Sequence, residues 1–112
     1  MTETTITRTD AAATVALSGE FEMAATFTVE PALEQVLETP GLEAVTLDLS
    51  AVTFIDSVGL GVIMRLLHEC EARRIALRIV PGPRQVQRVF EVSGLADALP
   101  FEDDRSGARV NG

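Results

Sequence analysis

Residues 44–73, which read AVTLDLSAVTFIDSVGLGVIMRLLHECEAR, decide the fold of this chain. The stretch opens with an apolar run of strand length at 44–49, and a short apolar segment at 52–55 extends it towards Asp56 and Ser57. A run of this kind is typical of a strand that is buried in the centre of a sheet. From residue 58 to residue 73 the apolar residues recur at helical spacing. We therefore predict a buried central strand that leads directly into a helix.

The segments before this unit predict a hairpin and a helix. Residues 4–9 and 14–18 are short and rich in Thr and Val, and the turn-like residues 10–13 separate them. From residue 25 to residue 38 the apolar positions, Phe27 among them, follow mostly helical spacing until Pro40 and Gly41 stop the pattern. The expected order is thus an N-terminal β-hairpin followed by a first helix.

The segments after the unit repeat the alternation. Residues 75–80 form a β-branched run that Pro81 to Pro83 close, residues 83–92 have helical spacing, and Gly94 fits a left-handed cap. A last helical turn or strand is expected over 95–101. Helices between strands imply right-handed crossovers onto a mostly parallel sheet, with the hairpin adding antiparallel pairing. We predict one α/β domain over residues 1–101 with three to four helices, and a flexible polar tail over 102–112.

Composition narrows the class of protein. The chain has 112 residues, a formal charge of −8 and a hydrophobic fraction of 46%, which favour a folded protein that repels nucleic acid and anionic membranes. No run approaches eighteen apolar residues, and residues 1–10 lack the features of a secretory signal. The single cysteine, Cys70, excludes an internal disulfide. We expect a cytoplasmic protein whose partners are other proteins.

Ser57 stands at the start of the helix that follows the central strand. Local chemistry predicts that its hydroxyl caps this helix, since serine is among the commonest N-cap residues. Projection at about 100° per residue assigns one helix face to the core: Leu60, Ile63, Met64, Leu67 and Cys70. The opposite face then carries Val58, Gly61, Val62, Arg65 and Glu69. Exposed valines beside a helix N-terminus indicate a docking surface, unless other elements cover them.

Three stretches resemble a known family. The run from Leu47 to Ile63, with its Asp-Ser-x-Gly-Leu core, resembles the signature of STAS domains, the family of anti-sigma-factor antagonists. The later run Arg88 to Leu95 resembles the second recurrent stretch of that family, and residues 18–22 resemble its early Gly-Glu-Leu-Asp turn. The chain departs from the family pattern at Glu22, where Asp is usual, and at Val58, where Ser or Thr is common.

The resemblance implies a function in partner switching. The family serine that matches Ser57 is phosphorylated by an anti-sigma factor with serine kinase activity, which implies that partner here and a phosphoserine phosphatase to reverse the step. Unmodified protein would capture the anti-sigma factor and free a sigma factor, and the phosphate on Ser57 would abolish this binding. We expect no cofactor, no metal and no enzymatic activity. The predicted partner-binding residues are Glu22, Asp56, Ser57, Val58, Gly61, Val62 and Arg65.

Other chemistries fit the sequence less well. A hydrolase elbow needs glycine two residues before its serine, where Ile55 stands, and His68 lies eleven residues along the helix from Ser57. The stretch from Gly59 to Met64 lacks the third glycine of a dinucleotide site. Consecutive helix residues at 68–71 diverge too far to share one metal ion. A STAS-type scaffold or ligand-sensing module in another signalling complex stays open as the alternative function.

Overall fold

Seven elements follow one another along residues 2–102, the part of the chain that the computed structural model describes. They are β1 (Thr2–Thr9), β2 (Ala12–Phe21), α1 (Met23–Leu37), β3 (Ala44–Ile55), α2 (Ser57–Arg73), β4 (Ala76–Val80) and α3 (Arg84–Val92). The strands form one sheet in the order β1-β2-β3-β4, in which β1 pairs antiparallel with β2 and the other pairs are parallel. The predicted α/β class, the N-terminal hairpin and the mostly parallel sheet are confirmed.

The hairpin turn is shorter than the sequence predicts. Only Asp10 and Ala11 lie between β1 and β2, and Asp10 takes a left-handed conformation with φ 48°, which Asp tolerates in turns. The prediction of a turn over 10–13 is therefore wrong in its second half. β2 also runs past residue 18, because shifts of register with β3 on both sides of Gly19 (φ 86°) keep its last residues paired.

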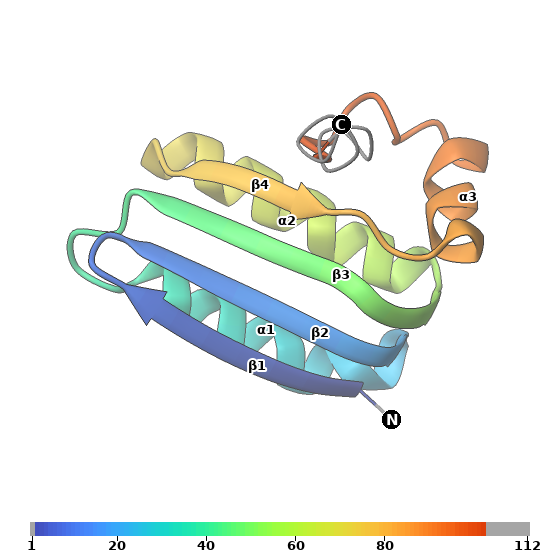
Figure 1. The fold of residues 1–112 in the computed structure, drawn as a ribbon, viewed down its shortest axis with the longest axis horizontal. Helices are drawn as coiled ribbons and strands as arrows, with labels where there is room; N and C mark the ends of the chain where they lie inside the picture. Colours follow the sequence, from blue (N-terminus) through green and yellow to red (C-terminus); the bar gives the residue numbers. More distant parts are fainter. Residues whose placement is uncertain (1, 103–112) are drawn as a thin grey trace, which may run out of the picture.

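The core lies between the sheet and two helices. In Figure 1, α1 and α2 lie side by side behind the sheet, and α3 stands beyond the ends of β3 and β4. The fully buried side chains include Leu17 and Phe21 from β2, Leu47 and Leu49 from β3, and Phe90 from α3. Alternation of buried and partly exposed residues along β2 and the first half of β3 places one strand face in this core. The central position predicted for residues 44–55 is confirmed.

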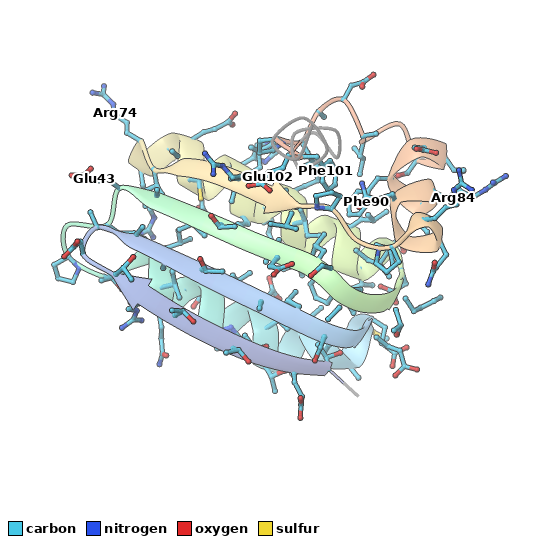
Figure 2. The ribbon with its side chains drawn as sticks, viewed as in Figure 1. Glu43, Arg74, Arg84, Phe90, Phe101 and Glu102 are labelled. Atoms are coloured by element: carbon cyan, nitrogen blue, oxygen red, sulfur yellow. The ribbon has the colours of Figure 1, made fainter. Side chains whose placement is uncertain are left out.

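The C-terminal segment closes the far edge of the sheet. Gly94 has φ 79° and the Leu95 N–H donates to the Phe90 carbonyl at 2.9 Å, so the predicted left-handed cap of α3 is confirmed. The expected turn or strand over 95–101 consists of turns and a single bridge between Phe101 and Ile79. Phe101 packs edge-to-face on Phe90 with ring centroids 4.9 Å apart (Figure 2).

The predicted polar tail begins within the fold and continues beyond the described residues. The Glu102 N–H donates to the Ile79 carbonyl at 2.8 Å, and its carboxylate pairs with Arg78 at 3.5 Å. Residues 103–112 lie outside the described part. Across residues 2–102, no helix is both long enough and apolar enough to cross a bilayer.

Candidate functional site

The N-terminus of α2 is capped by Asp56, one residue before Ser57. Asp56 has extended backbone angles (φ −111°, ψ −177°), and its Oδ1 accepts a hydrogen bond from the Gly59 N–H at 2.9 Å. This is the usual geometry of an N-cap, and a carboxylate there is also favoured by the helix dipole. Ser57 is therefore the first helical residue, and the prediction that its hydroxyl caps α2 is wrong.

Because Asp56 takes the cap position, the Ser57 hydroxyl is left available. Ser57 is exposed, and no hydrogen bond to its hydroxyl is present among residues 2–102. The N–H groups of the first helical turn lie beside it, with the positive end of the helix dipole. An exposed hydroxyl in this position is able to carry an anionic group without a clash inside the fold.

The backbone beneath Ser57 is held tightly. A Cβ atom added to Gly59 would lie 2.6 Å from the carbonyl oxygen of Phe21, the last residue of β2. The Asp56 N–H also donates to this carbonyl at 3.3 Å. Only glycine fits such a close backbone approach, which explains why the helix carries a glycine three residues after its cap. Ser57 thus sits on a rigid strand-to-helix junction.

Large apolar side chains are exposed at the same end of the sheet. Met23 and Phe27 on α1 are 59% and 79% exposed, and Phe54 on β3 and Val58 on α2 are 49% and 39% exposed. β2 and β3 are parallel, so α1 and α2 both begin at this end of the sheet (Figure 1). We call these four residues together with Ser57 the Ser57 surface. Exposed apolar side chains that gather on one surface are a common feature of protein interaction sites.

Sequence reasoning missed the contribution of α1 to this surface. The sequence groups Phe27 with the other apolar residues of its helix, although it lies about 160° round the helix from the buried Val29. Met23 lies four residues before Phe27, so the two share one helix face. A projection of α1 alone would have found this second apolar face.

The predicted partner-binding residues fall into two groups. Glu22, Asp56, Ser57 and Val58 come together at the junctions where α1 and α2 begin, and Glu22 is exposed as the N-cap residue of α1. Gly61 lies one turn further along α2 and is partly exposed. The structure therefore gathers the first group round Ser57 and leaves the remaining residues further along the helix.

Val62 and Arg65 belong to the contact between α1 and α2. Val62 is 2% exposed, so the prediction of an exposed valine is wrong. The reason is that α1 packs beside α2, which widens the buried stripe of α2 and also buries Leu66. Arg65 is exposed and binds Glu30 of α1, with its Nε 3.1 Å from Oε2. Both residues line a groove of about 400 Å³ between the two helices.

The remaining candidate groups of α2 show no reactive arrangement. Burial raises the pKa of the Cys70 thiol to about 11, so it stays protonated at neutral pH. His68 is exposed on the same helix. Within residues 2–102, no three His, Cys, Asp or Glu side chains cluster in a way that would hold a metal ion.

A family model and several solved structures match this chain. The model of the STAS domain matches residues 3–108. An anti-sigma factor antagonist from Mycobacterium paratuberculosis is 24% identical, with a TM-score of 0.81 over 99% of this chain and 93% of that chain. The unphosphorylated anti-sigma factor antagonist SpoIIAA is 20% identical, with a TM-score of 0.76 over 98% of this chain and 97% of that one.

Two further matches widen the range of similar proteins. SpoIIAA of Bacillus in its phosphorylated form is 16% identical, with a TM-score of 0.69 over 98% of this chain and all of that chain. A sulfate transporter family protein from Wolinella succinogenes is 20% identical, with a TM-score of 0.67 over 81% of this chain and 75% of that one. At these identities the structural likeness establishes the fold, and the function has to be argued from the site.

Proposed function

The chain belongs to the STAS domain family, and from this premise we propose that it is an anti-sigma factor antagonist controlled by phosphorylation of Ser57. In this proposal the unmodified protein binds an anti-sigma factor that has serine kinase activity, which frees a sigma factor. The observation that carries the proposal is the exposed Ser57 hydroxyl, which Asp56 releases from helix capping and which lies at the end of the sheet where large apolar side chains are exposed.

The Ser57 surface provides the docking area. Apolar side chains from α1, β3 and α2 would be buried against the partner, and burial of apolar area is the main driving force of protein association. Glu22, Asp56, Gly61 and Arg65 would border this contact, while the buried Val62 would support it from below. The partner would approach Ser57 closely, as a kinase that modifies it must.

A phosphate on Ser57 would act mainly at this interface. It adds about −1.5 to −2 charges at pH 7 next to Asp56, and Glu22 lies at the neighbouring junction where α1 begins. The N-terminus of α2 would tolerate the charge with about 0.3 to 1 kcal/mol of stabilisation, so the domain would stay folded. A dianion buried against the partner without a counter-charge would cost roughly 2 to 5 kcal/mol, which weakens binding about thirty-fold to several thousand-fold.

The proposal places the protein in the cytoplasm, where its partners would be the anti-sigma kinase and a phosphoserine phosphatase. The protein itself would have no enzymatic activity and would use no cofactor. It would control transcription without contacting DNA, in keeping with its formal charge of −8.

A ligand-sensing role is the second candidate, and one observation favours it. The α1–α2 groove of about 400 Å³ is large enough for a small molecule, and the similar fold of the sulfate transporter family protein shows that such domains occur in other settings. This role predicts binding that does not depend on Ser57.

A pull-down from cell extract, with and without ATP, tests the proposal. We expect the chain to retain an anti-sigma factor that is released on addition of ATP, and mass spectrometry to find phosphate on Ser57. Ser57→Ala should abolish the release, whereas Ser50→Ala, a change at an exposed serine of β3, should leave it intact. Retention that is insensitive to ATP, or release that survives Ser57→Ala, would contradict the proposal.

A further inference from the structure

The two strand-to-helix junctions at the Ser57 end lie against each other. β2 passes into α1 through Glu22, and β3 passes into α2 through Asp56. The Asp56 N–H donates to the Phe21 carbonyl at 3.3 Å, and Gly59 approaches the same carbonyl closely. Each junction is therefore part of the surroundings of the other.

One carboxylate serves both helices. Asp56 Oδ1 accepts from the Gly59 N–H of α2 at 2.9 Å, and Asp56 Oδ2 accepts from the Met23 N–H of α1 at 3.3 Å. Met23 is the first residue of α1, and its own N-cap residue, Glu22, makes no side-chain cap hydrogen bond. The first turn of α1 is thus capped from the neighbouring junction. Only an ionised Asp or Glu side chain offers two acceptor oxygens for such a double contact.

We propose that Asp56 is a positioning residue that fixes the N-terminus of α1 against that of α2 and so holds the two halves of the Ser57 surface in one arrangement. Met23 and Phe27 belong to one half, and Ser57 and Val58 to the other. The Glu30–Arg65 ion pair joins the same helices further along, so Asp56 controls chiefly the first turn of α1. The consequence for partner binding rests on the proposed function, while the positioning itself does not.

Amide hydrogen exchange of the full chain tests the positioning. Asp56→Ser keeps a good N-cap for α2 but removes the oxygen that accepts from Met23. We expect exchange in residues 23–26 to rise about tenfold, as for loss of a hydrogen bond to a charged group, while Leu60 keeps its protection. Asp48→Asn is the matched control, because Asp48 is a carboxylate of β3, the strand that leads to Asp56, and within residues 2–102 it accepts only from the Ser50 N–H. Unchanged exchange at 23–26 in Asp56→Ser would overturn the proposal.

A double-mutant cycle that combines Asp56→Ser with Met23→Pro separates loss of the Met23–Asp56 hydrogen bond from a general loosening of the fold. Proline is well accepted at the first position of a helix, and Glu22 already has the extended backbone that proline requires of its predecessor. Met23→Pro removes the N–H donor and leaves Asp56 in place. We expect Asp56→Ser to have no further effect on exchange at 24–26 in this background. An equal effect in both backgrounds would show that Asp56 acts on α1 by another route, which overturns the proposal.

A second experiment tests the role of Asp56 in docking by measuring the affinity of each variant for the anti-sigma factor recovered by pull-down. If Asp56 positions α1, the loss of affinity caused by Phe27→Ala should shrink severalfold in the Asp56→Ser background, while the loss caused by Val58→Ala should stay the same. Exchange effects together with a pull-down that recovers no anti-sigma factor would refute the proposed function and leave the positioning standing. If Asp56→Ser changed the effects of Phe27→Ala and Val58→Ala on affinity equally, its role in docking would be refuted.

Discussion

The two ends of α2 are built in opposite ways. At the N-terminal end the backbone is held tightly, by Asp56 and by the approach of Gly59 to β2, whereas Ser57 and Val58 are exposed. At the C-terminal end Cys70 is fully buried. Arg73 donates there to the Leu37 carbonyl at 3.1 Å and pairs with Glu69 at 3.2 Å.

The difference indicates how one helix serves both docking and stability. A docking end needs a fixed backbone and exposed side chains, because binding of a partner then costs little entropy for ordering the surface. At the other end the Cys70 thiol is buried in the core, and Arg73 covers the Leu37 carbonyl at the last residue of α1, where a basic side chain also complements the helix dipole. Each of the following changes tests one side of this comparison.

The largest effect is expected at Gly59. Gly59→Ala places a methyl group 2.6 Å from a backbone oxygen, which must move, and we expect the free energy of unfolding to fall by about 3 kcal/mol. Gly61→Ala is the matched control: its Cβ would meet only the end of the Arg65 side chain at 3.9 Å, so we expect a gain of about 0.5 to 1 kcal/mol. Urea denaturation followed by far-UV circular dichroism measures both. Similar effects at the two glycines would mean that the junction is not tightly packed.

The second-largest effect is expected at Cys70, whose ionisation should lower the free energy of unfolding at alkaline pH. The thiol loses its proton near pH 9.0 when unfolded and near pH 11 when folded, because burial raises its pKa. Between these values the folded state retains a proton that the unfolded state releases, so stability is full below pH 9 and falls by about 2 kcal/mol up to pH 11. The sequence contains neither Lys nor Tyr to obscure this titration. Denaturation at a series of pH values should show the slope in wild type and a nearly flat line in Cys70→Ala; parallel lines would refute the assignment.

Arg73 should have a smaller effect. Arg73→Ala removes both the hydrogen bond to Leu37 and the pair with Glu69, and we expect a loss of about 1 kcal/mol. Glu69→Ala removes only the exposed pair, for which we expect about 0.3 to 0.5 kcal/mol. The difference between their thermal melting temperatures isolates the carbonyl contact. Equal losses would mean that this contact contributes nothing.

The smallest effect on stability is expected at Ser57 itself. Since Asp56 and not Ser57 caps α2, Ser57→Ala should change the free energy of unfolding by less than about 0.5 kcal/mol. Asp56→Ala, which removes the cap, should cost about 1 to 2 kcal/mol. Chemical denaturation of the two variants side by side decides the point. A loss of 1 kcal/mol or more for Ser57→Ala would indicate that Ser57, and not Asp56 alone, caps α2.

The sequence predicts the positions of β3 and α2 along the chain better than it predicts the contacts that their residues make. The apolar run before Asp56 and the helical spacing after it locate β3 and α2 to within a few residues, because local periodicity determines both. Which residue caps the helix was predicted wrongly, since Asp and Ser are equally good caps and only the backbone angles distinguish them. Val62 was misplaced because its burial depends on α1, a neighbour that the periodicity of α2 does not reveal.

The Ser57 surface needs the tertiary structure for the same reason. Phe54 and Phe27 lie in different elements, and they come to one end of the sheet only because β2 and β3 are parallel. The contact from Met23 to Asp56 joins residues 33 positions apart, which no local pattern reports. The sequence identifies Ser57, and the fold supplies what surrounds it.

The central claim is that Ser57 switches partner binding without holding the fold. Titration calorimetry with the anti-sigma factor recovered by pull-down tests it most directly, using wild type, Ser57→Ala and Ser57→Asp. We predict that Ser57→Ala binds within a few-fold of wild type and that Ser57→Asp binds at least about thirty-fold more weakly, while all three remain equally folded. Equal affinity of the three proteins would contradict the account.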